Sequence, residues 1–110
     1  MSVRVLLVDD NEAVLGELRA LLLSHPRWLV CGEGMDGFEA VEKTKSLRPD
    51  IVLMDISMPR MNGLEATRII RREVPESEVI LISQNDPTIV SRQAAETGAS
   101  GYVAKSDLRS

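Results

Sequence analysis

The chain has 110 residues, 44 % of them hydrophobic and 27 % charged, and its formal net charge is −4. This composition is typical of one globular domain and excludes an intrinsically disordered chain. No apolar stretch approaches the roughly 20 residues that cross a bilayer, so we expect no membrane association. The largest basic cluster, Arg68 with Arg71 and Arg72, is too small to predict direct binding of nucleic acid.

The cysteine content and the first residues indicate a cellular compartment. Cys31 is the single cysteine, so it can form no internal disulfide, and its apolar neighbours predict a buried structural thiol. Acidic residues follow the apolar run Val5–Val8 at once, which is not the pattern of a secretory signal peptide. Both features favour a cytoplasmic protein.

The first part of the chain alternates short apolar runs with helical patterns. Val3–Val8 is predicted to be a buried strand, and Glu12–Leu23 a helix, because its apolar residues recur on one face. Trp28–Cys31 is predicted to be a second strand. Asp36 then begins a helix, with Glu39 three residues later as its capping-box partner.

The same alternation continues through the middle of the chain. Asp50–Met54 is predicted to be a third strand and Glu78–Ser83 a fourth. Between them, Asn62 and Glu65 repeat the capping-box spacing at the start of a helix. The apolar runs in both strands are continuous rather than alternating, which is typical of strands buried on both faces.

The last predicted elements complete an α/β pattern. Asp86 as N-cap, Pro87 at the first helical position and Gly98 just past the end frame a fourth helix, and Gly101–Ala104 follows as a fifth strand. Strands that alternate with helices predict βαβ units, and hence a doubly wound α/β fold with a five-stranded parallel sheet. Residues 106–110 are too few for a fifth helix.

Polar residues follow the predicted strands at one edge of this sheet. Asp9 and Asp10 follow strand one, Asp55 follows strand three, Ser83 ends strand four and Lys105 follows strand five. Ligands of open parallel sheets bind at this edge. Three crowded carboxylates repel, so either one is protonated or a hard cation such as Mg²⁺ (or Mn²⁺) lies among them. With an ammonium group and a hydroxyl nearby, the set predicts phosphoryl transfer to a carboxylate.

Four separated motifs resemble the receiver domains of two-component response regulators. They are Val8–Asn11, Met54–Gly63, Ser83 and Gly101–Lys105, and they span the chain from the first strand to the last. The final segment is most similar to receivers of the NarL/FixJ type. The resemblance implies a flavodoxin-like sheet with strand order 2-1-3-4-5.

The resemblance also implies a role for each residue of the acidic edge. Asp55 would be the phosphoacceptor and Lys105 would pair with the phosphoryl group. Asp9, Asp10, Asp55 and the backbone carbonyl of Ser57 would hold Mg²⁺.

The resemblance further implies a conformational switch, in which Ser83 moves to bond the phosphoryl group and Tyr102 changes rotamer. Two positions depart from the family pattern. Gln84 stands where most receivers have a small residue, so it could shield the phosphoryl group from water. Ser106 stands where many receivers have proline, so no cis-proline follows Lys105.

The implied partner is a sensor histidine kinase, and the implied output is control of a process such as transcription. The chain would be a phosphoacceptor signalling domain with Mg²⁺-dependent self-phosphorylation and autodephosphorylation, not an enzyme with its own substrate. DNA would be bound only through an effector domain absent from these residues. We expect residues 1–110 to be a receiver truncated before its last helix, because one helix cannot cover one face of five strands. A further helix or a homodimer would cover the remainder.

Three alternatives are weighed against this interpretation. Aspartyl-phosphate phosphohydrolases of the haloacid dehalogenase type place a second acid two residues after the nucleophile, where this chain has Ser57. A flavin carrier of the same fold class needs a phosphate-cradling loop after strand one, which is missing here. An unphosphorylated interaction module stays open, although intact Asp55 and Lys105 give no reason to prefer it.

Overall fold

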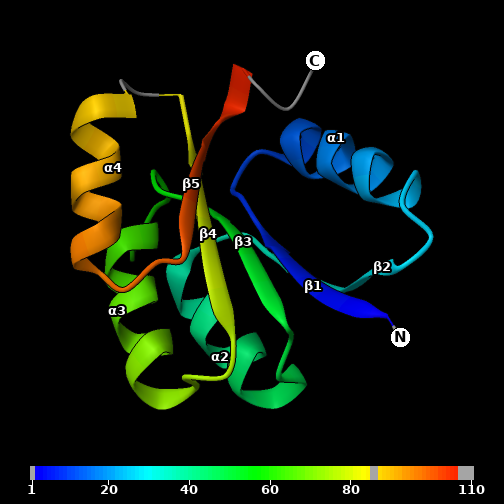
Figure 1. Cartoon of the computed structure of the whole chain (residues 1–110), viewed down its shortest axis with the longest axis horizontal. Helices are drawn as coiled ribbons and strands as arrows, with labels where there is room; N and C mark the ends of the chain where they lie inside the picture. Colours follow the sequence, from blue (N-terminus) through cyan, green and yellow to red (C-terminus); the bar gives the residue numbers. More distant parts are fainter. Residues whose placement is uncertain (1, 85–86, 107–110) are drawn as a thin grey trace.

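A computed structural model describes residues 2–84 and 87–106, with only the backbone of residues 87–91 (Figure 1). Strands and helices alternate along the described chain, as the sequence predicts. They are β1 (Val3–Val8), α1 (Glu12–Leu23), β2 (Trp28–Gly34), α2 (Gly37–Leu47), β3 (Ile51–Asp55), α3 (Gly63–Glu73), β4 (Glu78–Ser83), α4 (Pro87–Glu96) and β5 (Gly101–Ala104).

All strand pairs are parallel, and the sheet order is β2-β1-β3-β4-β5. This confirms the predicted doubly wound sheet. The inner strands carry the continuous apolar runs, since helices cover both of their faces. Residues such as Leu6, Val52 and Leu81 are 0 % exposed.

Two strand boundaries differ from the prediction. β2 continues past Cys31 to Gly34, because its pairing with β1 continues to the end of that strand, with Val8 opposite Gly34. β3 begins and ends one residue later than expected, so Asp55 is its last residue. Cys31 is half-buried rather than buried, beside a register shift in the β1–β2 pairing.

The helices divide between the two faces of the sheet (Figure 1). α1 covers one face, while α2, α3 and α4 cover the other, as right-handed crossovers require for this strand order. The α1 face contains one apolar core, formed by Val5, Leu7, Leu15, Leu18, Leu22, Leu53 and Ile82. The second core lies under the other three helices, and its members include Leu6, Val8, Ala40, Val52, Met54, Ala66, Ile70, Leu81 and Ala94.

The α1 face is not covered evenly. Leu53 and Ile82 are buried on it, whereas Ile51, Ile80 and Val103 are half-buried. Within residues 2–84 and 87–106, no α-helix follows β5. In the same residues, no helix has the length and apolar character needed to cross a membrane.

Side-chain caps begin the first three helices at the edge where the strands end. The Asn11 side chain accepts hydrogen bonds from the backbone N–H groups of Ala13 (2.9 Å) and Val14 (3.4 Å). The predicted caps of α2 and α3 are confirmed, since Asp36 and Asn62 accept from the residues three positions later at 2.8 and 2.9 Å. The predicted cap of α4, Asp86, lies outside the described residues.

The end of α4 follows the prediction. Gly98 has a φ of +91°, a conformation that favours glycine, and it lies just beyond the last helical residue.

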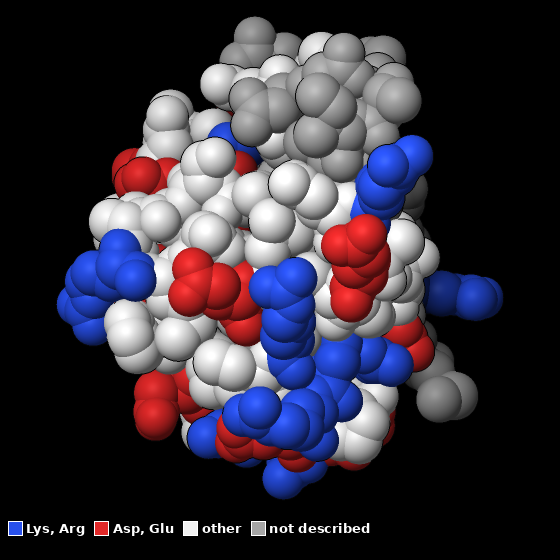
Figure 2. Space-filling view, turned by 90° about the vertical axis from the view of Figure 1, so that its left-hand side faces the viewer, with Lys and Arg blue, Asp and Glu red and all other residues white. Residues whose placement is uncertain are grey.

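The face on the α3 side presents charges of both signs side by side (Figure 2). Glu73 pairs with Lys45 at 2.7 Å and with Arg72 at 3.1 Å. Arg71 lies 3.9 Å from Glu78 and donates hydrogen bonds to the carbonyl groups of Pro75 and Ser77. Two arginines of the largest basic cluster, Arg71 and Arg72, therefore contact acidic or carbonyl groups.

Candidate functional site

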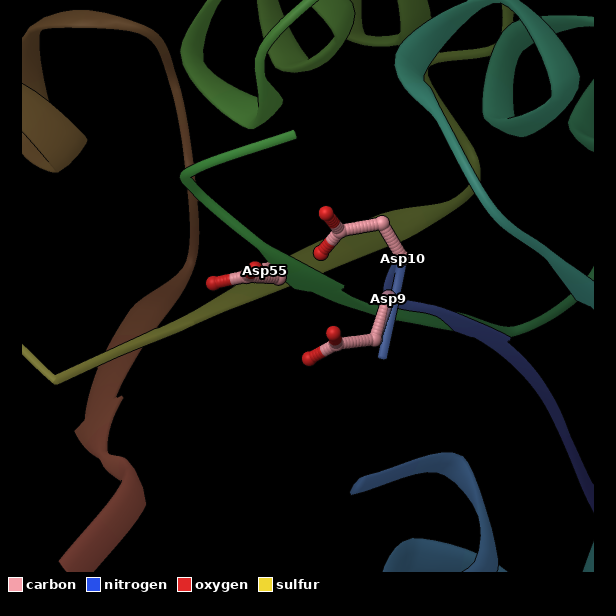
Figure 3. Close-up of side chains that lie close together, drawn as sticks. All are labelled: Asp9, Asp10 and Asp55. Atoms are coloured by element: carbon pink, nitrogen blue, oxygen red, sulfur yellow. The ribbon is translucent and has the colours of Figure 1, made fainter. Parts of the chain in front are cut away.

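Three carboxylates meet at the carboxyl edge of the sheet. Asp9 and Asp10 follow β1 directly, and Asp55 ends the neighbouring β3. Each offers an oxygen within 4.8 Å of the others. Figure 3 shows the three side chains extending to the same side of the strand ends. Asp10 is exposed, whereas Asp9 and Asp55 are only 0 % and 4 % exposed. The predicted cluster therefore exists, with two of its members buried.

Asp9 lies deepest in the cluster. Its Oδ1 accepts a hydrogen bond from the backbone N–H of Asn11 at 2.9 Å. Its buried Oδ2 accepts no well-directed hydrogen bond among the described residues, although Lys105 Nζ lies 3.1 Å away as an ion-pair partner. A buried carboxylate oxygen that accepts no well-directed hydrogen bond is suited to coordinate a cation.

Lys105 extends into the cluster from the far side of the sheet. Its Nζ lies 3.4 Å from Asp55 Oδ1, and its side chain is 14 % exposed. Strands are about 4.8 Å apart, so β5 is roughly 10 Å from β3 and only a long side chain can reach Asp55. The ammonium group of Lys105 therefore lies beside Asp55, where its expected pairing with a phosphoryl group requires it.

The cluster changes the protonation of its members. Burial raises the pKa of Asp55 from 3.8 to about 6, the charge of Asp9 adds to this, and Lys105 partly opposes it. Burial alone would lower the pKa of Lys105, but the two carboxylates hold it above its ordinary value. The ammonium group of Lys105 thus pairs with two of the three clustered acids, so negative charge remains that a divalent cation could neutralise.

A cavity of about 230 Å³ opens onto these groups. Its lining residues are Asp10, Asn11, Asp55, Ser57, Ser83, Gln84 and Lys105. Ser83 is buried at the end of β4, whereas Ser57 and Gln84 are exposed. The structure therefore brings together the predicted acceptor, lysine, hydroxyl and tuning residue around one space.

Two residues are placed differently from this group. Tyr102 does not line the cavity; it is half-buried in β5 and packs against the core beneath α2, α3 and α4. Asn11 does line the cavity, although the sequence interpretation included it only as the last residue of the motif Val8–Asn11 and gave it no role. The signal for a role was its position directly after Asp10 near the end of the first strand.

The segment after Asp55 is held close to the start of α3. The backbone N–H of Gly63 donates to the Ile56 carbonyl at 2.8 Å. A Cβ at position 63 would collide with the Asp55 carbonyl oxygen, so only glycine permits this approach. Gly63 thereby fixes the path of the chain through Ser57 at the cavity.

A family model for the response regulator receiver domain matches residues 5–109. The chain belongs to this family. Membership decides against the aspartyl-phosphate phosphohydrolase and the flavin carrier, and it makes the chain a phosphoacceptor signalling module. The triad Asp9, Asp10 and Asp55 is accordingly the acidic pocket of a receiver domain, consistent with the Mg²⁺ site typical of receivers.

Relatives of this receiver domain have different outputs. The transcriptional regulatory protein DegU of Brevibacillus brevis is 35 % identical over 104 residues, which are 94 % of this chain and 44 % of that protein. A protein-glutamate methylesterase/protein-glutamine glutaminase of Pyrococcus horikoshii is 42 % identical over 109 residues, which cover 94 % of this chain and 28 % of that protein. The chain thus spans less than half of both relatives, and one is a transcription regulator while the other is an enzyme.

A solved structure shows the same fold with a phosphoryl mimic. The CheX-CheY-BeF3-Mg complex from Borrelia burgdorferi matches with a TM-score of 0.88 and 26 % identity, covering 97 % of this chain and 84 % of that one.

Proposed function

We propose that this receiver domain accepts a phosphoryl group on Asp55 from a sensor histidine kinase and then changes conformation to control an output such as transcription. The observation that carries the proposal is the arrangement around Asp55. Its carboxylate lines the cavity, lies 3.4 Å from Lys105 Nζ and has an oxygen within 4.8 Å of oxygens of two further acids, Asp9 and Asp10. Receiver domains interact with histidine kinases and effectors, which supports the partner.

The metal assigned to this site is Mg²⁺ or Mn²⁺, held by Asp9, Asp10, Asp55 and the backbone carbonyl of Ser57. The all-oxygen donor set fits such an ion, as does the buried Oδ2 of Asp9, which pairs with Lys105 but accepts no well-directed hydrogen bond among the described residues. When bound, the ion supplies charge neutralisation for phosphoryl oxygens. Metal-bound complexes of a related receiver, as in the Borrelia burgdorferi structure, support the assignment.

The positions of the other groups at the cavity assign a role in phosphoryl transfer to each of them. A carboxylate oxygen of Asp55 is the nucleophile, because it is the acid that combines burial with access to the cavity. Lys105 places a positive charge against a phosphoryl oxygen, and the Ser83 hydroxyl can donate to another. In phosphoryl transfer, such positioning and charge neutralisation supply most of the catalysis.

The same residues connect the site to a distant surface. A phosphoryl group adds a charge of about −1.5 to −2 next to Ser83 and Lys105. Ser83 ends β4, and Lys105 follows the strand that carries Tyr102. Recruitment of both residues favours one of two arrangements of β4, α4 and β5, with Tyr102 in its inward rotamer. This segment is the proposed output surface.

The effector belongs outside these residues. Residues 1–110 are assigned to the receiver part of a longer regulator, an assignment supported by the fraction of the relatives' length that the chain spans. DNA binding, if it is the output, belongs to that effector part, and a homodimer is proposed as one way to cover the remainder of the α1 face.

Acetyl phosphate tests the proposal. The chain is incubated with acetyl phosphate and Mg²⁺, and its intact mass is followed over time. We expect one phosphoryl group on the wild type, none after chelation of Mg²⁺ and none on Asp55→Asn. Labelling of Asp55→Asn at the wild-type rate would assign the acceptor elsewhere.

A further inference from the structure

Asn11 reaches the cavity with one polar group still available. Its Oδ1 accepts two hydrogen bonds from the first turn of α1, and its backbone N–H donates to Asp9 Oδ1 at 2.9 Å. Its carbonyl accepts from Val14 and Leu15 at 3.1 Å each. Within the described residues, Nδ2 donates no hydrogen bond. Because Asn11 lines the cavity, Nδ2 is the group that it offers to a ligand there.

The position of Asn11 suits a particular part of the reaction. Asp55 is buried at the floor of the cavity, whereas Asn11 is exposed at its mouth. The attacking and leaving atoms of a phosphoryl transfer lie roughly in line with the phosphorus. A leaving group displaced by Asp55 therefore departs toward the mouth and past the exposed residues that line it.

We propose that Asn11 determines phosphodonor specificity by donating a hydrogen bond from Nδ2 to an oxygen leaving group. The inference rests on the proposed function, in which Asp55 is the acceptor. With an acyl phosphate, a carboxylate oxygen of Asp55 forms a bond to phosphorus while the phosphorus–oxygen bond to the acyl group breaks. The electron pair stays on the departing carboxylate, and the Asn11 N–H stabilises the charge that grows there.

A donor with a nitrogen leaving group gains nothing from this contact. In phosphoramidate the phosphorus–nitrogen bond breaks and the nitrogen departs as ammonia, carrying its own protons. It presents hydrogen-bond donors toward Asn11, not an acceptor. Asn11 cannot turn its Oδ1 toward it without losing the two cap bonds of α1.

Two substitutions separate donation from capping. Asn11→Ser retains a side chain that caps helices well, but its hydroxyl is too short to replace Nδ2. Asn11→Asp retains the cap acceptor and removes every donor from the side chain. The matched control is Asn62→Ser, because Asn62 caps α3 in the same manner at 2.9 Å and does not line the cavity.

The experiment compares rates of Asp55 phosphorylation by acetyl phosphate and by phosphoramidate, with Mg²⁺ present, in the full chain. A charge-assisted hydrogen bond is worth about 1.5 kcal/mol, equivalent to roughly tenfold in rate. Both Asn11 variants should lower the ratio of the two rates about tenfold, chiefly through acetyl phosphate, while Asn62→Ser keeps the wild-type ratio. Far-ultraviolet circular dichroism identifies any variant that is unfolded. If one Asn11 variant is unfolded, the rate ratio of the other Asn11 variant tests the inference.

An unchanged ratio in the folded Asn11 variants would overturn the inference even if both rates fell, since a loss of structure or of metal binding affects both donors alike. A wild type that takes phosphoryl from neither donor would instead overturn the proposed function, and the inference with it.

Discussion

Asp55 is an acid whose surroundings oppose its charge. Burial and the neighbouring Asp9 raise its pKa to about 6, and Lys105 offsets only part of this effect. A carboxylate held in this way is destabilising to the fold unless a cation neutralises it. The site is thus arranged for ligands rather than for stability.

Replacing Asp55 with asparagine should therefore stabilise the metal-free chain at neutral pH. The raised pKa means that the stability contributed by protonated Asp55 is complete below 3.8 and is lost as the pH rises through about 6. We expect a gain of about 1–2 kcal/mol in the free energy of unfolding at neutral pH, and almost none near pH 4. Urea denaturation of the wild type and of Asp55→Asn, with a chelator present, measures the difference in free energy of unfolding at each pH. A variant less stable than the wild type at neutral pH would contradict the account.

Gln84 is exposed at the mouth of the same cavity. Because its amide can obstruct the approach of water, Gln84→Ala should shorten the lifetime of the phosphoryl group about threefold, equivalent to about 0.7 kcal/mol of barrier. Dephosphorylation followed by intact mass gives the rates. Gln93→Ala, at an exposed position of α4, is the matched control. Equal lifetimes for Gln84→Ala and the wild type would remove Gln84 from the mechanism.

At the scale of elements, the sequence is sufficient for the strands and most helix starts. Continuous apolar runs identify the buried strands, and the residues at their ends include most of the cavity lining. The end of β2 was not predictable, because it depends on pairing with β1 up to Val8 and not on local pattern. No specific role for Asn11 was predictable from its sequence position, because its place at the cavity as well as at the start of α1 is visible only in the folded site.

The proposed coupling between the site and a distant surface runs through β4, α4 and β5. We expect beryllofluoride with Mg²⁺ to shift amide resonances beyond the cavity, in α4 and in β5 up to Tyr102. The reason is the proposed binding of the mimic by Ser83, which ends β4, and by Lys105, which follows β5. Two-dimensional NMR of the isotope-labelled chain provides the measurement. In Ser83→Ala, the shift changes should be confined to residues near the cavity. Shifts that stop at the cavity in the wild type would refute the coupling.

At the scale of the whole molecule, helices are distributed unequally over the sheet. Among residues 2–84 and 87–106, three helices cover one face and α1 alone covers the other, where Ile51, Ile80 and Val103 are half-buried (Figure 1). Apolar surface that remains in water is unfavourable by about 25 cal/mol per Å². A second apolar surface placed on these residues would therefore stabilise the molecule.

We expect this 110-residue chain to self-associate through that face. Sedimentation velocity should show a concentration-dependent increase in mass, and a hydrophobic dye should bind the dilute chain. Ile80→Ser should weaken association, because Ile80 lies on β4 within the half-buried group. A monomer at all concentrations that binds no dye would show that the face needs no further cover.

The central claim is that Asp55 is the residue that carries the phosphoryl group, and the most direct test identifies that residue chemically. The chain is phosphorylated with acetyl phosphate and Mg²⁺, then treated with borohydride, which reduces an aspartyl phosphate to homoserine. Tandem mass spectrometry of the peptides locates the homoserine. We predict homoserine at position 55 and unmodified aspartate at positions 9 and 10. Homoserine at position 9 or 10, or none at position 55 in a phosphorylated chain, would contradict the account.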